Sequence, residues 1–259
     1  MRKSLLVLLL WAPLTMAMIP QPGQRLEQAT QQAIQHFLLH NRILDTAQDL
    51  DKAPYIVAAD AGRVLGANGE RVYARGVLDP TQPQYGIFRR GKAYTDPDTQ
   101  ELLGINADDI GTARFVMAGD LTTLAVQRVT QEVRPGDRLL RAEPPAEPPA
   151  EPATLKPARF VQGHIIDVPK GVTQIGVLDA VTLNKGRRDG LVEGQLLAVI
   201  KAGASVRDTL TGASTQLPDE RAGTLVVFRT YEKLSYGLVL SASRALAVRD
   251  RFETAQQTQ

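Results

Sequence analysis

A stretch rich in proline and glutamate, RAEPPAEPPAEPATLKP, begins at Arg141, just past the middle of the 259-residue chain. Proline has no backbone N–H, so a strand through this stretch would lack the donors that a β-sheet needs. The repeated AEPP unit favours extended polyproline II, which makes a fairly stiff spacer. The sequence therefore predicts a linker over residues 142–157. A motif that docks on an aromatic groove is the alternative interpretation.

Short apolar runs separated by clusters of Gly, Asn, Asp and Pro fill both sides of this linker. Runs of this length and spacing indicate β-strands joined by turns. The first half contains YIVAA, RVYARGVL, YGIFRR, ARFVMA, TTLAVQRV and DRLLRA, and the second contains RFVQGHIIDV, TQIGVLDAVTL, GQLLAVIKA, GTLVVFRTY, YGLVLSAS and DRFETA. We therefore predict a mainly β fold.

The two halves share the order of these features. Gly91 and Gly203 are 112 positions apart, as are Gly111 and Gly223, and the motifs GDRLL and RDRFE then close the two halves. Chance similarity between two glycine-punctuated β segments is the alternative, because β-rich sequences share turn residues. Duplication predicts two related lobes, each a small antiparallel barrel or sandwich, joined by the proline-rich linker.

The first 17 residues have the pattern of a secretory signal peptide. Arg2 and Lys3 precede an apolar run, and Thr15 and Ala17 are spaced like a cleavage site. A membrane anchor is the alternative, but a spanning helix needs about 20 apolar residues and Pro13 interrupts this run. We therefore expect export to the periplasm, with the mature protein free there or associated with the outer membrane or cell wall, and no later transmembrane span.

Charge and cysteine content restrict the classes of partner. The formal net charge of +2 falls to 0 without Arg2 and Lys3, whereas binding to nucleic acid needs a clustered positive surface. The chain has no cysteine, so we expect neither disulfides nor a lipid anchor on cysteine. Nucleic acid is therefore not an expected partner.

An amphipathic helix is predicted from Gln24 to His40, ending near Asn41. The full expected organisation is a signal peptide (1–17), an N-terminal segment with this helix (18–52), a first β-lobe (53–141), the linker (142–157), a second β-lobe (158–255) and a disordered tail (256–259). The apolar face of the helix consists of Leu26, Ala29, Ala33, Ile34, Phe37 and Leu38.

The three histidines, His36, His40 and His164, are the first residues to consider for chemistry. His36 and His40 have metal-ligand spacing on the helix, but no third ligand is evident and a catalytic zinc site uses three. His164 lies outside the helix and could act as a base, but the chain has no Gly-x-Ser-x-Gly motif of a serine hydrolase. We expect no catalytic residue, no metal and no cofactor, and a periplasmic hydrolase that uses His164 is kept as a remote alternative.

Three charged motifs are predicted to be turns. DPDT, residues 96–99, suits a type I turn in which Asp96 bonds to the backbone, and ADDI, residues 107–110, suits a solvated turn. GRRDG, residues 186–190, lacks the Lys-Ser/Thr pair of a phosphate-binding loop and suits a hairpin turn. Arg187 and Arg188 within it form a candidate contact for an anionic polymer such as peptidoglycan.

The second half, with TQIGVLDAVTLNKGRRDGLVEGQLLAVI and AGTLVVFRTYEKLSYGLVLSASRALAVRDRFE, resembles the C-terminal β-domain of FlgT-like flagellar envelope proteins. The motifs FLLHNRIL, KAPYIVAADAGRVLGANGERVYARG and YGIFRRGKAYTDPDTQELLG are similar to the region after the LysM domain in the family of type IV pilus secretin-associated proteins (TsaP-like). Together the resemblances cover about residues 34–255.

The resemblance implies a non-catalytic periplasmic protein that binds peptidoglycan through LysM and associates with an outer-membrane secretin. No LysM signature is recognisable in this chain, so peptidoglycan binding rests on the family alone. The expected function is therefore an envelope scaffold or assembly factor with a secretin or another envelope protein as its partner. Direct peptidoglycan binding without a partner complex is the alternative. If the lobes bind by strand addition, the strands RFVMAGD and TLVVFRTY are expected to be exposed and are the best candidates. Phe228, Tyr231 and Tyr236 are the candidate partner-binding residues.

Overall fold

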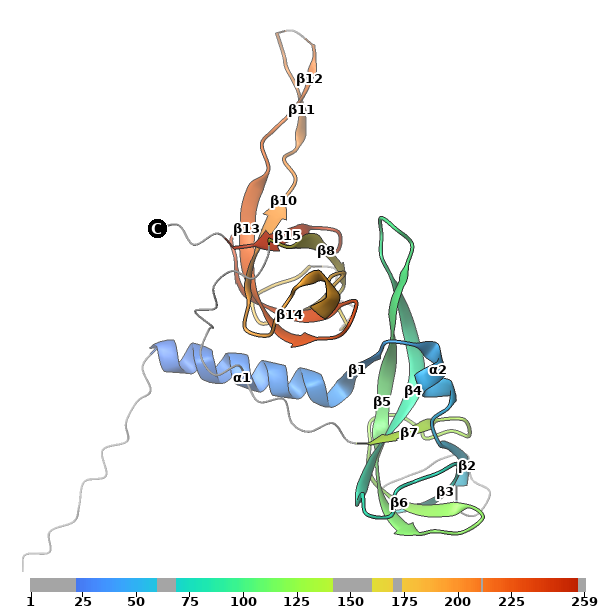
Figure 1. Ribbon diagram of the computed structural model, residues 1–259. Coiled ribbons are helices and arrows are strands. Elements are labelled where there is room, and N and C mark those ends of the chain that lie inside the picture. Colours follow the sequence, from blue (N-terminus) through green and yellow to red (C-terminus); the bar gives the residue numbers. More distant parts are fainter. Residues whose placement is uncertain (1–21, 60–68, 142–159, 170–173, 211, 256–259) are drawn as a thin grey trace, which may run out of the picture.

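The computed structural model describes residues 22–59, 69–141, 160–169, 174–210 and 212–255 (Figure 1). The expected signal peptide, the proline-rich linker and the tail lie outside these ranges. None of the helices inside them is both long enough and apolar enough to cross a membrane.

The first described element is the long helix α1, Pro22–His40, which confirms the helix predicted from Gln24. It passes directly into strand β1, Asn41–Leu44, and then into the short helix α2, Ala47–Asp51. The side chain of Thr46 caps α2 by accepting a bond from the amide N–H of Asp49. Neither β1 nor α2 is among the elements expected from the sequence.

A first barrel follows, and its strands are antiparallel. The strand β5 pairs with β4 on one side and with β6 on the other, which closes the ring in the order β5-β4-β7-β2-β3-β6. Because β5 is 16 residues long, its β6 edge also has room for β1. The strands are β2 (Tyr55–Ala59), β3 (Arg71–Arg75), β4 (Gln84–Thr95), β5 (Leu102–Met117), β6 (Thr122–Val129) and β7 (Arg138–Arg141).

A second closed barrel has the order β10-β13-β14-β9-β8-β15. Starting its ring at β13 gives β13-β10-β15-β8-β9-β14, which is the order of the first barrel strand for strand. The prediction of two related β-lobes is therefore confirmed. The strands are β8 (Gln162–Asp167), β9 (Ala180–Leu183), β10 (Leu196–Lys201), β13 (Glu220–Thr230), β14 (Ser235–Ala242) and β15 (Arg251–Thr254), and β11 (Ser205–Arg207) pairs with β12 (Ser214–Gln216) outside the barrel.

The repeated glycines Gly111 and Gly223 occupy equivalent places in the two barrels. A Cβ atom on Gly111 would lie 2.2 Å from the carbonyl oxygen of Arg128, and one on Gly223 would lie 2.6 Å from that of Ser241. Both distances are far below van der Waals contact. Glycine is needed at both positions because β5 and β13 approach the next strand too closely for a side chain.

The closing turns before β7 and β15 are also equivalent. The carboxylate of Asp137 accepts a bond from the amide of Arg134, and that of Asp250 accepts one from Ala247. The preceding residue has a left-handed backbone in both turns, with φ of 93° in the first barrel and 79° at Arg249 in the second. The first turn has glycine there, which adopts this conformation without strain, and the second carries a strained arginine.

The prediction of a solvated turn at ADDI is wrong. ADDI lies inside β5 rather than in a turn, and Asp109 is buried. Both carboxylate oxygens of Asp109 accept bonds from Arg128 on β6, at 2.8 and 2.9 Å, and His40 approaches one of them at 2.9 Å. The two consecutive aspartates favour a turn locally, but the paired arginine allows the strand to continue through them.

Candidate functional site: the docked hairpin and the exposed surfaces

Each barrel extends one hairpin beyond its body, and the two hairpins are aligned by the repeat. We call residues 91–104 of β4 and β5 the first hairpin, and residues 203–210 and 212–216, which include β11 and β12, the second hairpin. The tips are built alike. The amide of Asp96 donates to the carbonyl of Glu101 at 2.9 Å, and the amide of Asp208 donates to that of Ala213 at 2.8 Å. Their environments differ, because the first hairpin bonds to the other barrel through Asp96 and Asn184, whereas the described residues of the second hairpin extend away from both barrels (Figure 1).

An apolar cluster joins α1, the first hairpin and the second barrel. Phe37 of α1 lies edge-on to Phe228 and to Tyr236, with ring centroids 5.5 and 4.7 Å apart. Such edge-to-face pairs stabilise beyond the area that they bury. The buried members of this shared cluster are Ile34, Phe37, Ile43, Tyr94, Leu103, Ala180, Val226, Phe228, Leu234, Tyr236 and Leu238.

This cluster changes the interpretation of the aromatic residues proposed for partner binding. Phe228 and Tyr236 are 1% and 0% exposed, and Tyr231 is partly buried against the same cluster. The hydroxyl of Tyr231 accepts a 3.4 Å bond from the amide of Ile43 on β1. The three aromatics do form a contact surface, but what it contacts in this structure is the N-terminal part of the same chain. The expectation that TLVVFRTY is exposed is therefore wrong.

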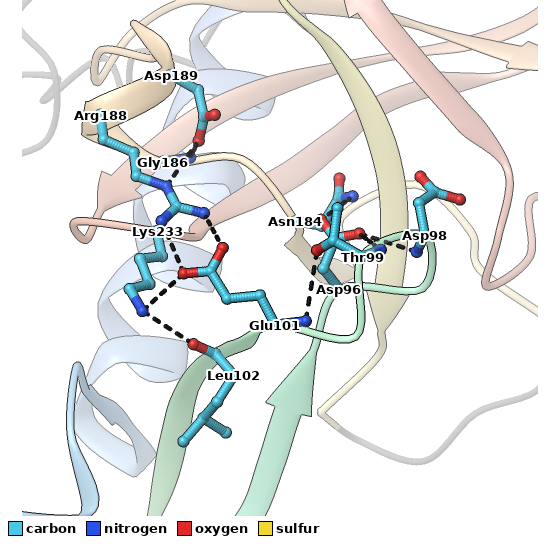
Figure 2. Close-up of polar contacts among 10 residues, drawn as sticks. All are labelled: Asp96, Asp98, Thr99, Glu101, Leu102, Asn184, Gly186, Arg188, Asp189 and Lys233. Carbon is cyan, nitrogen blue, oxygen red and sulfur yellow. Dashed lines mark hydrogen bonds and ion pairs between the residues drawn. The ribbon is translucent and has the colours of Figure 1, made fainter.

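The tip of the first hairpin is attached to the second barrel through Asp96 (Figure 2). Its Oδ1 accepts bonds from the amides of Asp98 and Thr99, which confirms the predicted turn. Its Oδ2 accepts a 3.0 Å bond from the side-chain amide of Asn184. Burial alone would raise the pKa of Asp96, but the bonds from Thr99, Asp98 and Asn184 outweigh it and lower the pKa.

Glu101, at the end of the same tip, bridges two cations of the second barrel (Figure 2). Its two oxygens accept bonds from Arg188 at 2.9 and 2.7 Å, and Lys233 lies 2.8 Å from one of them. Lys233 also donates to the carbonyl of Leu102. The bonds from Arg188 first, and then from Lys233, lower the pKa of Glu101 to about 2. The tip therefore keeps its negative charge throughout the physiological pH range.

Three more polar contacts join the first hairpin to the second barrel. Lys92 forms an ion pair with Asp167, and the hydroxyl of Tyr94 donates to the same carboxylate at 3.1 Å. Burial, with the carboxylate as a smaller cause, raises the pKa of Tyr94, so its hydroxyl stays protonated as a donor. His164 lies 3.4 Å from the carboxylate of Asp98. These polar contacts surround the shared cluster and fix the orientation of the hairpin.

The remaining candidate residues from the sequence make contacts within the chain. Arg188 is occupied by Glu101, and Arg187 lies 3.7 Å from Glu232, both in a single 3-10 turn at Arg187–Asp189 rather than a hairpin turn. Arg188 therefore does not serve with Arg187 as a contact for an anionic polymer, and of the two candidates Arg187 remains. Among the described residues, no group of three His, Cys, Asp or Glu side chains could hold a metal ion. His164 lies in the contact between the lobes, where its Nδ1 is 3.4 Å from the carboxylate of Asp98.

One candidate strand end is exposed. In RFVMAGD, Val116 and Met117 at the end of β5 are 42% and 62% exposed. The amide of Phe115 still bonds to the carbonyl of Pro83, so the ladder between β5 and the β4 side ends just before these two residues. Val116 and Met117 therefore form an apolar strand end near the turn between β5 and β6.

The second hairpin is the other exposed element, and sequence reasoning did not identify it. All residues of β11 and β12 are exposed. Val206 is 39% and Leu210 is 95% exposed, and Leu217 just beyond the hairpin is 45% exposed. A long exposed hairpin with apolar side chains is a strand edge on which another chain can pack. The equal spacing of the repeats was the signal that could have predicted it.

An arginine-lined cavity of about 430 Å³ lies beside α2. Arg89 is held there by two bonds to Asp137, whereas Arg90 is exposed at the surface. Arg134 and Arg138 complete its cationic lining. Asp51 and Asp137 also line the cavity, so its four arginines and two aspartates leave a formal excess of two positive charges.

Comparison with models of known protein families finds no match, and comparison with curated protein sequences finds none either.

Proposed function

We propose that this protein is an exported, non-catalytic scaffold of the cell envelope that associates with an outer-membrane secretin or a similar envelope machine. The ordered motifs shared with secretin-associated and FlgT-like proteins support this proposal, together with the signal-peptide pattern at the N-terminus. The structure adds two barrels that pack through a buried cluster, an arrangement suited to presenting binding surfaces at fixed positions.

The single observation that carries the proposal is the exposed strand end at Val116 and Met117. It belongs to one of the two strands predicted to bind a partner, and it is the one that the fold leaves accessible. Apolar side chains at the end of a paired strand favour partners that add a strand or cover the patch. The partner that this chemistry fits is a protein with an exposed strand edge.

The strand end predicts how a variant will behave in the envelope. Replacing both residues, Val116→Asp and Met117→Asp, should reduce recovery of a cross-linked secretin-class partner with the tagged full chain by roughly tenfold or more. The reason is that burying two carboxylates in an apolar contact is strongly unfavourable. The measurement is quantitative identification of proteins that co-purify after cross-linking of intact envelopes.

Val248→Asp is the matched control, because Val248 is 44% exposed on the second barrel, away from the strand end. It should leave partner recovery unchanged. Undiminished recovery with the double variant would reject the strand end as the binding surface. If the wild-type chain enriches no envelope protein over an untagged control, the scaffold function itself is wrong.

Direct binding to peptidoglycan is the second candidate, and the arginine-lined cavity is the observation that favours it. Anionic cell-wall polymers are attracted to such clustered guanidinium groups. In a pelleting assay with purified sacculi, a wall-binding protein sediments and Arg90→Glu weakens its sedimentation. A scaffold that binds only protein partners stays in the supernatant.

A further inference from the structure

The two hairpins are the same length. Ile87 pairs with Gly111 at the base of the first hairpin, and Val199 pairs with Gly223 at the base of the second. Ile87 and Val199 are 112 positions apart, and so are Gly111 and Gly223. Neither hairpin therefore has an insertion or deletion relative to the other. The first hairpin is docked on the second barrel, whereas the second hairpin points away from the first barrel of its own chain (Figure 1).

We propose that the second hairpin docks on the first barrel of another copy of this chain, in the way that the first hairpin docks on the second barrel within the chain. This inference goes beyond the proposed scaffold function and does not depend on it. It rests on the residues that the repeat places at equivalent positions in the two contacts.

The strand registers identify the equivalent positions on the barrels. His164 pairs with Arg251 at the start of β15, and Tyr55 pairs with Arg138 at the start of β7. Since β7 and β15 are equivalent strands, Tyr55 is the counterpart of His164. β3 pairs with β6 in the same register as β9 pairs with β14. The offset of 109 positions therefore also relates β3 to β9.

The first transferred contact becomes an ion pair. Within the chain, Asp96 of the hairpin accepts a bond from Asn184, which directly follows β9. The counterpart of Asp96 is Asp208, and the counterpart of Asn184 is Arg75 at the end of β3. Arg75 is exposed. An aspartate that met an amide in the first contact therefore meets an arginine in the second, which is a favourable pairing.

The second transferred contact changes from charged to apolar on both sides. Asp98 and His164 lie 3.4 Å apart in the docked hairpin. Their counterparts are Leu210 and Tyr55. Leu210 is almost fully exposed, and Tyr55 is half-buried with the guanidinium of Arg138 over its ring. Leucine against an aromatic ring is a typical hot-spot contact once water is excluded.

The third transferred contact changes in the same way. Tyr94 donates to Asp167 in the docked hairpin. The counterparts are Val206 on β11 and Ala58 on β2, both apolar. Partners have therefore changed together at these three positions, and none of the three transferred pairs sets a charge against an apolar side chain. This joint complementarity is what points to a second copy as the occupant rather than to an unrelated protein.

The resulting contact is heterologous, because the hairpin of one copy meets the barrel of the next. Repetition of a heterologous contact gives a closed ring if the rotation closes and an open filament if it does not. A purified full-length mature chain should therefore self-associate in a concentration-dependent manner, without any other component.

Sedimentation analysis of that chain tests the proposal. Leu210→Glu should weaken self-association by roughly tenfold or more, because the side chain that fills the contact becomes charged. Val248→Glu, a change of the same kind on an exposed valine outside the hairpin, should leave it unchanged. A wild-type chain that stays monomeric at every concentration overturns the proposal.

Cysteine pairing then tests the geometry, and the absence of native cysteine makes it selective. A mixture of the single variants Leu210→Cys and Tyr55→Cys should form a disulfide-linked dimer on mild oxidation, whereas Leu210→Cys mixed with Val248→Cys should not. A dimer formed only between two Leu210→Cys chains would show a symmetric contact and contradict the head-to-tail arrangement. Capture of a different envelope protein by Leu210→Cys, with no link between copies, would also contradict it.

Discussion

Phe37→Ala should lower the free energy of unfolding by about 3–5 kcal/mol, the usual cost of removing a buried phenylalanine. Phe37 is 2% exposed and lies between two aromatic rings of the second barrel. It is also the point where α1, which continues directly into β1 on the first barrel, attaches to the second. The change therefore weakens a contact that both barrels share. Chemical denaturation followed by circular dichroism gives the difference.

Val77→Ala is the matched control, since Val77 is 95% exposed. It should change the free energy of unfolding by no more than about 0.5 kcal/mol. An equally small effect of Phe37→Ala would mean that α1 does not pack on the second barrel as described.

Gly111→Ala should destabilise the first barrel by about 1–3 kcal/mol or more, because the added methyl group has no space. Its Cβ would lie 2.2 Å from the carbonyl oxygen of Arg128, so the backbone of β5 or β6 has to shift. That shift also disturbs the ion pair between Arg128 and the buried Asp109. The midpoint of thermal unfolding should fall accordingly.

Gly176→Ala is the control for the glycine change. The nearest atom to a Cβ there is an oxygen of Asp179 at 3.7 Å, which is ordinary van der Waals contact. It should unfold like the wild-type chain. A Gly111→Ala protein with unchanged stability would contradict the proposed reason for glycine in both repeats.

The strand pattern and the spacing of the repeat predicted most of the fold, because both are local properties. The run TTLAVQRV coincides with β6, and the 112-residue spacing of Gly111 and Gly223 reflects equivalent close approaches of strands. The extra strands β1, β11 and β12 were missed. These strands are short, and β11 and β12 are largely polar. β1 forms a strand because β5 offers it an edge, and β11 and β12 pair with each other as the two arms of the second hairpin.

The site was harder to predict, because it depends on contacts between residues far apart in the sequence. DPDT suits a turn, and it is one, but the second oxygen of Asp96 bonds to a residue 88 positions away. Phe228 and Tyr236 suit an exposed aromatic surface until α1 is seen to cover the outside of the barrel. Local pattern cannot show which face of a barrel strand a distant helix covers.

The most direct test of the locked two-barrel arrangement is cleavage of the chain between the lobes. A specific protease site placed within residues 142–157 allows the linker to be cut, and size-exclusion chromatography then measures whether the fragments separate. The shared cluster and the bonds of Asp96 and Glu101 predict that the two fragments stay together and elute at the position of the uncut chain. Two folded fragments that elute separately would contradict the account.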